Sequence, residues 1–424
     1  MKKERLRISM LVHGYPPREN AGTEQHSLQL TESLRQRGHI VQIIAATRSP
    51  AHKHASILSS DPHLIRIVNN VAARPLHRGE REKTIEKEIQ RHLERFQPDI
   101  IHVQHLQFLS SGLRFKCPSI LTLHDAWLWC AAGGTELHDG DTPCSGAEPK
   151  KCASCSSHWT PQLNRLGEGL ISAAERLSRI IRAETLHSIW KSLPVSIRKY
   201  ASKTSPPAVP PAKDAEMRNR TMRETAASFD IRIAPSQYLA TRATQHGCGP
   251  IHVLRHGIDI QRKHIGGDGF VFIGSITHHK GPDLVSQAHR EAFPTNAPAL
   301  KLYGPILDTN LHRYHPLLGP LSRERVLDVL QHSDALVMGS RWPENAPLII
   351  LEALAVGCPV IAPHIGGIPE LIQHGRNGLL YEAGNQHSLT QTLINFQRHR
   401  FKILPPKRRA QQVDEHIELY RNLL

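Results

Sequence analysis

The amino-acid sequence predicts an α/β protein with two doubly wound domains. Short apolar runs of strand length alternate with segments of helical spacing along both halves of the chain. These runs carry few polar residues, which is typical of strands in a parallel sheet covered by helices on both faces. The length of 424 residues is more than one hydrophobic core usually holds. With 39% hydrophobic and 21% charged residues, the composition excludes collagen, coiled coil and wholesale disorder.

The expected strands form two series. The first series comprises Ile8–Val12, Ile40–Ala45, Ile100–Val103, Ile120–Leu123 and Ile231–Ala234, and the second comprises Ile251–Leu254, Phe270–Ile273, Leu300–Tyr303, Ala335–Met338 and Pro359–Ala362. Segments such as Glu24–Arg37 and Pro282–Ala292 have the apolar spacing of the intervening helices.

The domain boundary is expected where the alternation stops and starts again. Residues 130–227 interrupt the alternation, and a new series of strands begins at Ile251. We therefore assign residues 1–245 to an N-terminal domain, in which residues 130–160 form a cysteine-rich insertion. Residues 246–405 form a C-terminal domain and residues 406–424 a final helix.

The chain is strongly basic. It has 53 Lys and Arg against 38 Asp and Glu, a net charge of +15 before any of the 29 His are counted. Nucleic acid, anionic lipid headgroups and nucleotide diphosphates are all partners that such a charge attracts. No stretch approaches the ~18 to 20 apolar residues of a membrane span, and the start lacks the long apolar run of a signal peptide. We expect a cytoplasmic protein.

The segment Ser340–Ala362 is the most informative part of the chain. After the strand at Ala335–Met338 comes a polar turn, and Pro347 then stands where the first turn of a helix tolerates its missing N–H. Leu348–Leu354 is the predicted helix, and Gly357 ends it. The free N–H groups of a helix start bind anions, and open α/β sheets bind ligands at the carboxyl ends of their strands. A diphosphate fits this place.

Two carboxylates flank the predicted helix start. Glu344 precedes it and Glu352 lies about a turn and a half inside it. Carboxylates accept hydrogen bonds from sugar hydroxyls, so the arrangement suits a ligand with phosphates in the middle and hydroxyl-bearing rings at both ends. A nucleotide sugar has that shape. The alternative is a first-turn charge followed by a solvated Glu.

Several motifs in the chain resemble, in the same order, those of the retaining glycosyltransferases of family four. The matching segments are Tyr15–Pro17 with Ala21–His26, Arg37–Val41, Thr122–Trp127, Ile233–Ser236, His256–Asp259, Phe272–Ser275 with His279–Gly281, Glu344–Glu352 and Gly366–Glu370. This resemblance implies the GT-B fold, in which two Rossmann-like doubly wound domains face a cleft. It also implies that the N-terminal domain binds the acceptor, that the C-terminal domain binds the nucleotide sugar, and that the final helix crosses back to the first domain.

The resemblance assigns roles to individual residues. It makes Glu344 a contact to the donor sugar, Glu352 a contact to the ribose and Lys280 a contact to the phosphates, while Gly22 lets the backbone approach a phosphate. His124 would lie near the acceptor and the reacting carbon. The catalytic set is His124, Lys280 and Glu344, and the donor-binding set is Gly22, Ser275, Lys280, Arg341, Glu344, Asn345, Ala346, Leu348 and Glu352.

This chain also departs from the family pattern. Ser275 stands where the family usually has an arginine for the phosphates, and Asn345-Ala346-Pro347 replaces the commoner Pro-Phe-Gly. Charge at the diphosphate therefore rests on Lys280 or on Arg341. The donor is expected to be a UDP- or GDP-sugar, and no catalytic metal is required because Lys280 and the helix N–H groups can take its place.

The insertion contains a candidate metal site. Its spacing, Cys130-x13-Cys144-x7-Cys152-x2-Cys155, suits a structural Zn²⁺, with His138 and His158 as replacement ligands. The alternatives are free thiols or a CxxC redox pair. Asp139 and Asp141 resemble the metal-binding Asp-x-Asp of another glycosyltransferase fold, but no apolar strand precedes them, so we interpret them as a turn.

The charge and one basic, apolar stretch suggest where the protein works. Ile189–Tyr200 mixes apolar and basic residues, and we expect reversible attraction to the anionic inner face of the membrane and a lipid-linked or polysaccharide acceptor. The alternative is a partly buried helix with a solvated basic edge, because Pro194 breaks a continuous face. A non-catalytic nucleic-acid or scaffold protein with a zinc knuckle is the rival function. Only 5% of residues are aromatic and the basic ones are dispersed, so no nucleic-acid partner is expected.

Overall fold

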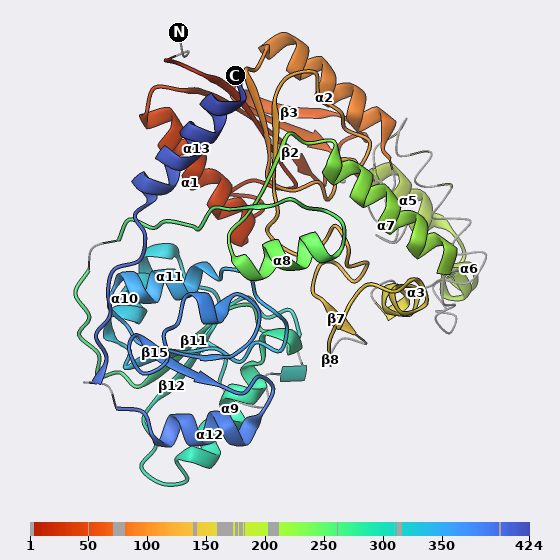
Figure 1. Ribbon diagram of the computed structural model, residues 1–424. Coiled ribbons are helices and arrows are strands. Elements are labelled where there is room, and N and C mark those ends of the chain that lie inside the picture. Colours follow the sequence, from red (N-terminus) through yellow and green to blue (C-terminus); the bar gives the residue numbers. More distant parts are fainter. Residues whose placement is uncertain are drawn as a thin grey trace.

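The computed structural model describes two stacked α/β units (Figure 1). It describes residues 4–49, 51–70, 81–138, 142–158, 173, 177, 181, 183–201, 212–260, 262–308, 310, 311, 316–397 and 400–424. Each unit is built on its own sheet, one of eight strands and one of five.

The first sheet belongs to the N-terminal unit and has the order β10-β9-β6-β5-β1-β2-β4-β3. All its pairings are parallel except that of β3 with β4, an edge hairpin that the sequence pattern did not predict. Its strands are β1 (Arg7–Val12), β2 (Ile40–Thr47), β3 (Ile57–Asp61), β4 (Leu64–Val68), β5 (Ile100–Val103), β6 (Ser119–Thr122), β9 (Ile231–Ala234) and β10 (His252–Val253). The helices of this unit include α1 (Gly22–Gln36), α2 (Lys83–Phe96), α7 (Ala212–Ala227) and α8 (Gln237–Gln245).

The first sheet is buried on both faces, as the unbroken apolar strands predict. Leu11 and Ile44 lie in one hydrophobic core with α2, and Ile8, Met10 and Val41 lie in another with α1.

The second sheet has the order β12-β11-β13-β14-β15 and is entirely parallel. Its strands are β11 (Phe270–Ile273), β12 (Leu300–Tyr303), β13 (Ala335–Val337), β14 (Val360–Pro363) and β15 (Gly378–Tyr381). Between them lie η2 (His278–Lys280), α9 (Pro282–Ala292), α10 (Arg323–His332), α11 (Leu348–Ala355), η4 (Ile368–Glu370) and α12 (Gln386–Ile394). The five C-terminal strands include four that the sequence predicts, and β15 is the one it missed.

The boundary between the two units differs from the prediction. We expected Ile251–Leu254 to open the second series, with the boundary at residue 245. Instead β10 pairs in parallel with β9, through His252 with Ile233 and Val253 with Ala234. A short run such as Ile251–Leu254 after a helix can join either sheet, so its pattern alone did not decide its partner.

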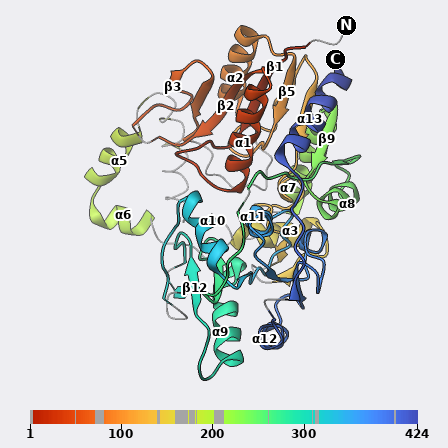
Figure 2. The ribbon, with the colours of Figure 1, turned by 90° about the vertical axis from the view of Figure 1, so that its left-hand side faces the viewer.

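The last helix, α13 (Arg409–Leu423), lies beside α1 of the first unit (Figures 1 and 2). Val413, Ile417 and Tyr420 are buried in the same core as Ile8 and Met10 of β1. The chain thus crosses from the first unit to the second and returns.

The described residues between β6 and β9 form an insertion in the first unit. It contains β7 (Leu137–His138), β8 (Thr142–Pro143), α3 (Pro149–His158), α5 (Ala183–Ser192) and α6 (Val195–Ala201). Figure 2 shows α5 and α6 at the edge of the molecule. Within the part of the chain that the structure describes, none of the helices combines the length and the apolar character that crossing a bilayer requires.

Candidate functional site

Two loops at the carboxyl edge of the second sheet bring the predicted phosphate and sugar contacts together. η2 follows β11, and the loop with Glu344 follows β13, which pairs with β11. Gly281, with φ of +67°, lies against Gly339 so closely that an ideal Cβ on Gly281 would be 2.6 Å from the carbonyl carbon of Gly339. Only bare glycine backbones allow two loops to approach this closely. As a result, Nζ of Lys280 lies 2.7 Å from Oε1 of Glu344, 64 positions along the chain.

The Lys280 and Glu344 pair is held by its surroundings. The hydroxyl of Ser340 donates to the same Glu344 oxygen at 2.8 Å, and the indole ring of Trp342 lies 4.8 Å from Nζ of Lys280. The Glu344 side chain is 7% exposed and that of Lys280 is 25% exposed. An ammonium has three N–H donors, and the more exposed side of this one can therefore reach a bound anion while Glu344 keeps it in place.

A second pair of glycines supports the Glu344 loop from β14. The N–H of Gly367 donates to the carbonyl of Glu344 at 2.7 Å. A Cβ on Gly366 would lie 2.8 Å from the backbone N of Glu344, and one on Gly367 would lie 2.9 Å from the carbonyl carbon of Asn345. The two glycines of the Gly366–Glu370 motif thus serve close packing, not chain flexibility.

Helix α11 begins beside this pair, nearly where the sequence predicts. Pro347 is the N-cap in extended conformation and not a first-turn residue, because its fixed φ of −60° is combined with ψ of 119°. Ala346 and Leu348 are partly buried at this start. The helix runs to Ala355, and Gly357, at φ of +79°, ends it as predicted. The helix begins after the loop that follows β13, at the sheet edge that also carries Lys280, and the predicted binding of an anion by its first N–H groups stays a prediction.

Glu352 lies deeper, on α11. Burial raises its pKa, and the positive charges of Arg323 and Arg409 lower it, with a net increase. Nη2 of Arg323 lies 3.8 Å from Oε1 of Glu352. The predicted contact of this carboxylate to a ribose stays a prediction.

The remaining predicted donor residues have different surroundings. Arg341 forms a two-pronged ion pair with Asp283 at 2.9 and 2.8 Å and donates to the carbonyl of His278 at 2.7 Å. Arg341 and Lys280 are thus both paired with a carboxylate, and the predicted phosphate contact of either stays a prediction. Ser275 is partly buried directly after β11, and Gly22 is exposed at the first residue of α1. A Cβ on Gly22 would meet nothing within 4 Å, so the protein itself does not require glycine there.

His124 lies directly after β6, at the carboxyl edge of the first sheet. Its Nε2 is 2.9 Å from Oε1 of Gln104, a fully buried side chain after β5. Burial lowers the pKa of His124 well below its usual range, and the nearby His256 lowers it further. The imidazole is therefore neutral at physiological pH and acts as a hydrogen-bonding group rather than a cation.

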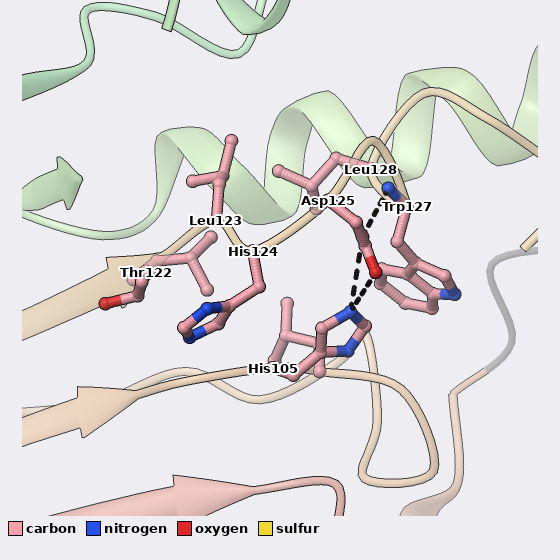
Figure 3. Close-up of a pocket in the computed structure, with 9 residues that line it drawn as sticks. His105, Thr122, Leu123, His124, Asp125, Trp127 and Leu128 are labelled. Atoms are coloured by element: carbon pink, nitrogen blue, oxygen red, sulfur yellow. Dashed lines mark hydrogen bonds and ion pairs between the residues drawn. The ribbon is translucent and has the colours of Figure 1, made fainter. Parts of the chain in front are cut away.

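A small cavity with about 20 Å³ of free space lies next to His124. That is room for about one water molecule. Figure 3 shows its walls, formed by His105, Leu106, Leu121, Thr122, Leu123, His124, Asp125, Trp127 and Leu128.

His105 and Asp125 in this cavity wall are hydrogen-bonded to each other. Nε2 of His105 lies 3.3 Å from Oδ2 of Asp125, and the N–H of Gln107 donates to Nδ1 of His105 at 3.0 Å. Because Nδ1 accepts this N–H, Nε2 is the ring nitrogen that faces the carboxylate. Burial raises the pKa of Asp125, but His105 and the N–H of Trp127 lower it below its ordinary value. Asp125 is therefore a fixed anion beside His124.

The two halves of the site meet through Asn345. Its Nδ2 donates to the backbone carbonyl of His124 at 2.7 Å, and its side chain is buried. The residue next to Glu344 on the second unit is thus hydrogen-bonded to the residue that we expect near the acceptor on the first. The structure brings His124, Lys280, Glu344 and Asn345 to one place between the sheets.

Sequence reasoning missed several residues of the site. Gln104, His105 and Asp125 follow β5 and β6, and His13, after β1, lies 3.0 Å from Glu24 of α1. Their common position after neighbouring parallel strands is the signal that could have identified them.

The zinc prediction is not supported. The four predicted ligands do line one small cavity, but no group of three or more His, Cys, Asp or Glu side chains among the described residues is arranged to hold a metal ion. Local partners explain this: the N–H of Glu136 donates to Sγ of Cys130 at 3.3 Å, and Nδ1 of His138 lies 3.1 Å from Sγ of Cys155. All of Cys130, Cys144, Cys152 and Cys155 are free thiols, and Asp139 and Asp141 lie outside the described residues.

Comparison with known families matches both halves of the chain. The model of the glycosyl transferases group 1 matches residues 261–412, and the model of Glycosyltransferase Family 4 matches residues 21–145. The chain belongs to these glycosyltransferases. The predicted family is confirmed, and the non-catalytic alternative is not supported.

Two similar proteins are a synthase and a putative glycosyltransferase. The N-acetyl-alpha-D-glucosaminyl L-malate synthase of Bacillus anthracis is 41% identical over 85 residues, 20% of this chain and 22% of that protein. The putative colanic acid biosynthesis glycosyltransferase WcaL of Salmonella typhimurium is 23% identical over 314 residues, 68% of this chain and 73% of that protein. The first match covers well under two thirds of the relative's length, so it shows kinship and not a shared substrate.

Solved structures confirm the GT-B fold. Sucrose-phosphate synthase from Thermosynechococcus elongatus superposes with a TM-score of 0.61 at 15% identity, over 99% of both chains. Anabaena HepE, solved in complex with UDP and glucose, superposes with a TM-score of 0.58 at 15% identity, over 99% of this chain and all of that one. At this identity the likeness concerns the fold alone.

Proposed function

We propose that the protein transfers a sugar from a nucleotide-diphosphate sugar to an acceptor hydroxyl, with retention of configuration at the anomeric carbon. The observation that carries the proposal is the meeting of Lys280 and Glu344, 2.7 Å apart, beside the start of α11 and opposite His124. A cation, a carboxylate and free helix N–H groups at one sheet edge suit a diphosphate joined to a sugar. That Anabaena HepE was solved with UDP-glucose supports the donor class.

Lys280 would act on the leaving group. Departure of the nucleoside diphosphate builds negative charge on its phosphate oxygens, and a fixed ammonium with helix N–H groups stabilises that charge more in the transition state than in the ground state. No catalytic metal is needed for this. Glu344 would accept hydrogen bonds from the sugar hydroxyls, and Glu352 from the ribose.

His124 would act on the other side of the cleft. Its neutral ring and the anionic Asp125 lie on the first unit, beside the loop of the second unit that carries Glu344 and Asn345, here called the donor loop, because Asn345 donates to the backbone carbonyl of His124. A neutral imidazole accepts or donates one hydrogen bond at each nitrogen, and the one not bonded to Gln104 can contact an acceptor hydroxyl.

Substitution of Lys280 tests the proposal. Lys280→Ala should lower sugar transfer by about 100- to 1,000-fold, as removal of one preorganised charge partner does, while thermal unfolding shows a folded protein. Lys301→Ala is the matched control, because Lys301 forms an exposed ion pair with Asp268 at 3.0 Å in the same unit. Wild-type turnover by a folded Lys280→Ala protein would exclude this assignment.

The stereochemistry and the metal requirement are tested separately. The product should keep the anomeric configuration of the donor sugar when followed by NMR during the first turnovers. Transfer should continue in EDTA, because Lys280 and α11 supply the positive field. An inverted product, or activity that EDTA abolishes and Mg²⁺ restores, would contradict the respective part of the proposal.

We further propose a polysaccharide or lipid-linked acceptor at the inner face of a membrane. Ile189, Val195 and Ile197 on α5 and α6 are 50%, 68% and 39% exposed, and Lys191 and Arg198 lie among them. Apolar side chains next to basic ones at the edge of the molecule bind anionic lipid, and each basic residue near the surface contributes about 1 kcal/mol. A soluble acceptor would leave this face merely solvated.

Vesicle flotation decides the membrane proposal. The protein should float with anionic vesicles at low salt and not with neutral ones, because salt and neutral lipid remove the attraction. Ile189→Ser combined with Val195→Ser should weaken flotation without changing turnover of a soluble acceptor analogue. Equal flotation with both vesicle types, or with neither, would contradict the membrane part and leave the donor site untouched.

A further inference from the structure

One carboxylate of the second unit binds the start of a helix of the first. Glu370, at the end of η4, accepts the backbone N–H of Gln237 at 2.9 Å and that of Tyr238 at 2.7 Å, both in the first turn of α8. Nη2 of Arg255 lies 3.2 Å from the same carboxylate. Glu370 is 133 positions from Gln237 and 132 from Tyr238 along the chain. One side chain of the second unit thus binds two backbone groups of the first.

The contact satisfies groups that would otherwise lack partners. The first N–H groups of a helix have no acceptor within the helix, and they carry the positive end of its dipole. Ser236, the N-cap of α8, accepts the N–H of Leu239 at 3.2 Å and so satisfies a donor from within the first unit. Gln237 and Tyr238 donate across the interface instead. Separation of the units would expose these two N–H groups and the Glu370 charge to water.

The loop that carries Glu370, the Gly366–Glu370 loop, is also bonded to the donor loop that carries Glu344. Gly367 donates to the carbonyl of Glu344 at 2.7 Å, and Gly366 packs against the backbone of that residue with no space for a side chain. A Cβ on Gly367 would also lie 3.0 Å from Cβ of Ser236 on the first unit. The donor loop, the Gly366–Glu370 loop and α8 therefore form one continuous, tightly packed path across the cleft.

We propose that Glu370 is a positioning residue that holds the two units in the arrangement in which the donor loop faces His124. It acts by binding the start of α8, where each of its two carboxylate oxygens accepts one backbone N–H. The proposal rests on the proposed function for its effect on turnover, but the contact itself can be measured without any substrate.

Hydrogen exchange of two variants tests the contact. In Glu370→Ala, the amides of Gln237 and Tyr238 should exchange roughly 10- to 100-fold faster, the range expected on losing hydrogen bonds to a charged group. Glu370→Gln keeps the side-chain volume but only one accepting oxygen, and should show a smaller increase. The radius of gyration from small-angle scattering should rise in Glu370→Ala because the units separate.

Ser236→Ala is the matched control, because it removes a cap of the same helix from within the first unit. It should speed exchange at Leu239 and leave the radius of gyration unchanged. If both variants change scattering and exchange alike, Glu370 merely stabilises α8 and the proposal is wrong. Unchanged exchange at Gln237 and Tyr238 in Glu370→Ala also overturns it.

A kinetic experiment separates domain positioning from damage to the donor loop. Lys280 and Glu344 both belong to the second unit, so Glu370→Ala should lower kcat about 10-fold or more while the Kd for UDP or GDP changes less than about twofold. Weaker nucleotide binding with unchanged kcat would place the effect on the donor loop and overturn the proposal. If the wild type transfers no sugar, the proposed function fails, and exchange and scattering still decide whether Glu370 joins the units.

Discussion

Substitution of Gly281 by alanine tests the geometry of the donor site. Gly281 has φ of +67°, and an ideal Cβ there would lie 2.0 Å from the carbonyl oxygen of Gly339. Real Cβ atoms essentially never approach within 3.0 Å of such an atom. The loop that carries Lys280 must therefore move by about 1 Å away from the loop that carries Glu344.

Gly281→Ala should lower both the stability of the protein and its turnover, and the two effects can be measured separately. The left-handed backbone conformation costs an alanine about 1 to 2 kcal/mol of stability, whatever surrounds it. The displacement of Lys280 adds an effect on catalysis, since a misplacement of about 1 Å typically lowers turnover about 100-fold. We expect Gly281→Ala to lose about that factor in release of the nucleoside diphosphate from the donor.

Gly384→Ala measures the cost of the left-handed backbone conformation alone. Gly384 lies in the same unit at φ of +74°, and a Cβ there would meet nothing within 4 Å. It should lose about 1 to 2 kcal/mol in urea unfolding and keep full turnover. A Gly281→Ala protein that unfolds like Gly384→Ala and turns over like the wild type would refute the claim that glycine packing places Lys280.

Two further predictions concern buried titratable groups. Burial lowers the pKa of His416 to about 4, so between pH ~6.5 and 4 the unfolded chain binds a proton at this residue that the native one does not. As the pH falls through this range, His416 therefore lowers the free energy of unfolding by about 1.4 kcal/mol per pH unit, in addition to what other buried histidines contribute. His416→Gln should reduce that slope by this amount in urea titrations at pH 7, 6 and 5, and an unchanged slope would contradict it. Burial also raises the pKa of Cys130 to about 11, so at pH 7.5 it has roughly 300-fold less thiolate than an exposed cysteine. Mass spectrometry should show slow alkylation of Cys130 by iodoacetamide, equally slow with a chelator, whereas acceleration by the chelator would indicate a bound metal.

The sequence predicted the second unit better than the first because its signals are local there. A buried strand, a polar turn, Pro347 and the Gly357 stop lie within a short stretch, and each acts through its own backbone. The edge hairpin of β3 and β4 has no such signal, and its place in the sheet depends on the pairing of β4 with β2, which lies earlier in the chain. The position of β10 was also unpredictable locally, because its short apolar strand fits either sheet.

Among the residues of the candidate site, too, those with local sequence signals were predicted and those without such signals were missed. Lys280 and Glu344 stand in motifs at the ends of strands, so their approach to one edge follows from the parallel sheet. Gln104 and Glu370 act on a ring nitrogen and on two backbone N–H groups, and nothing in the sequence near them names such partners. The cysteine spacing was misleading because the distance between residues along the chain does not fix how their thiols are oriented. The four thiols line one cavity, but the described residues form no group that could hold a metal ion.

The glycines explain why this site is built from loops that lie far apart in the sequence. Lys280 precedes Gly281, which rests on Gly339, and Glu344 lies under Gly366 and Gly367. Each of these contacts is made by backbone alone, so the three loops form a tightly packed layer at the sheet edge that holds Lys280 and Glu344 beside each other. A side chain at any of these glycines would separate the loops. The glycines of the motifs therefore set the distance between the two charges, on which the proposed donor site depends.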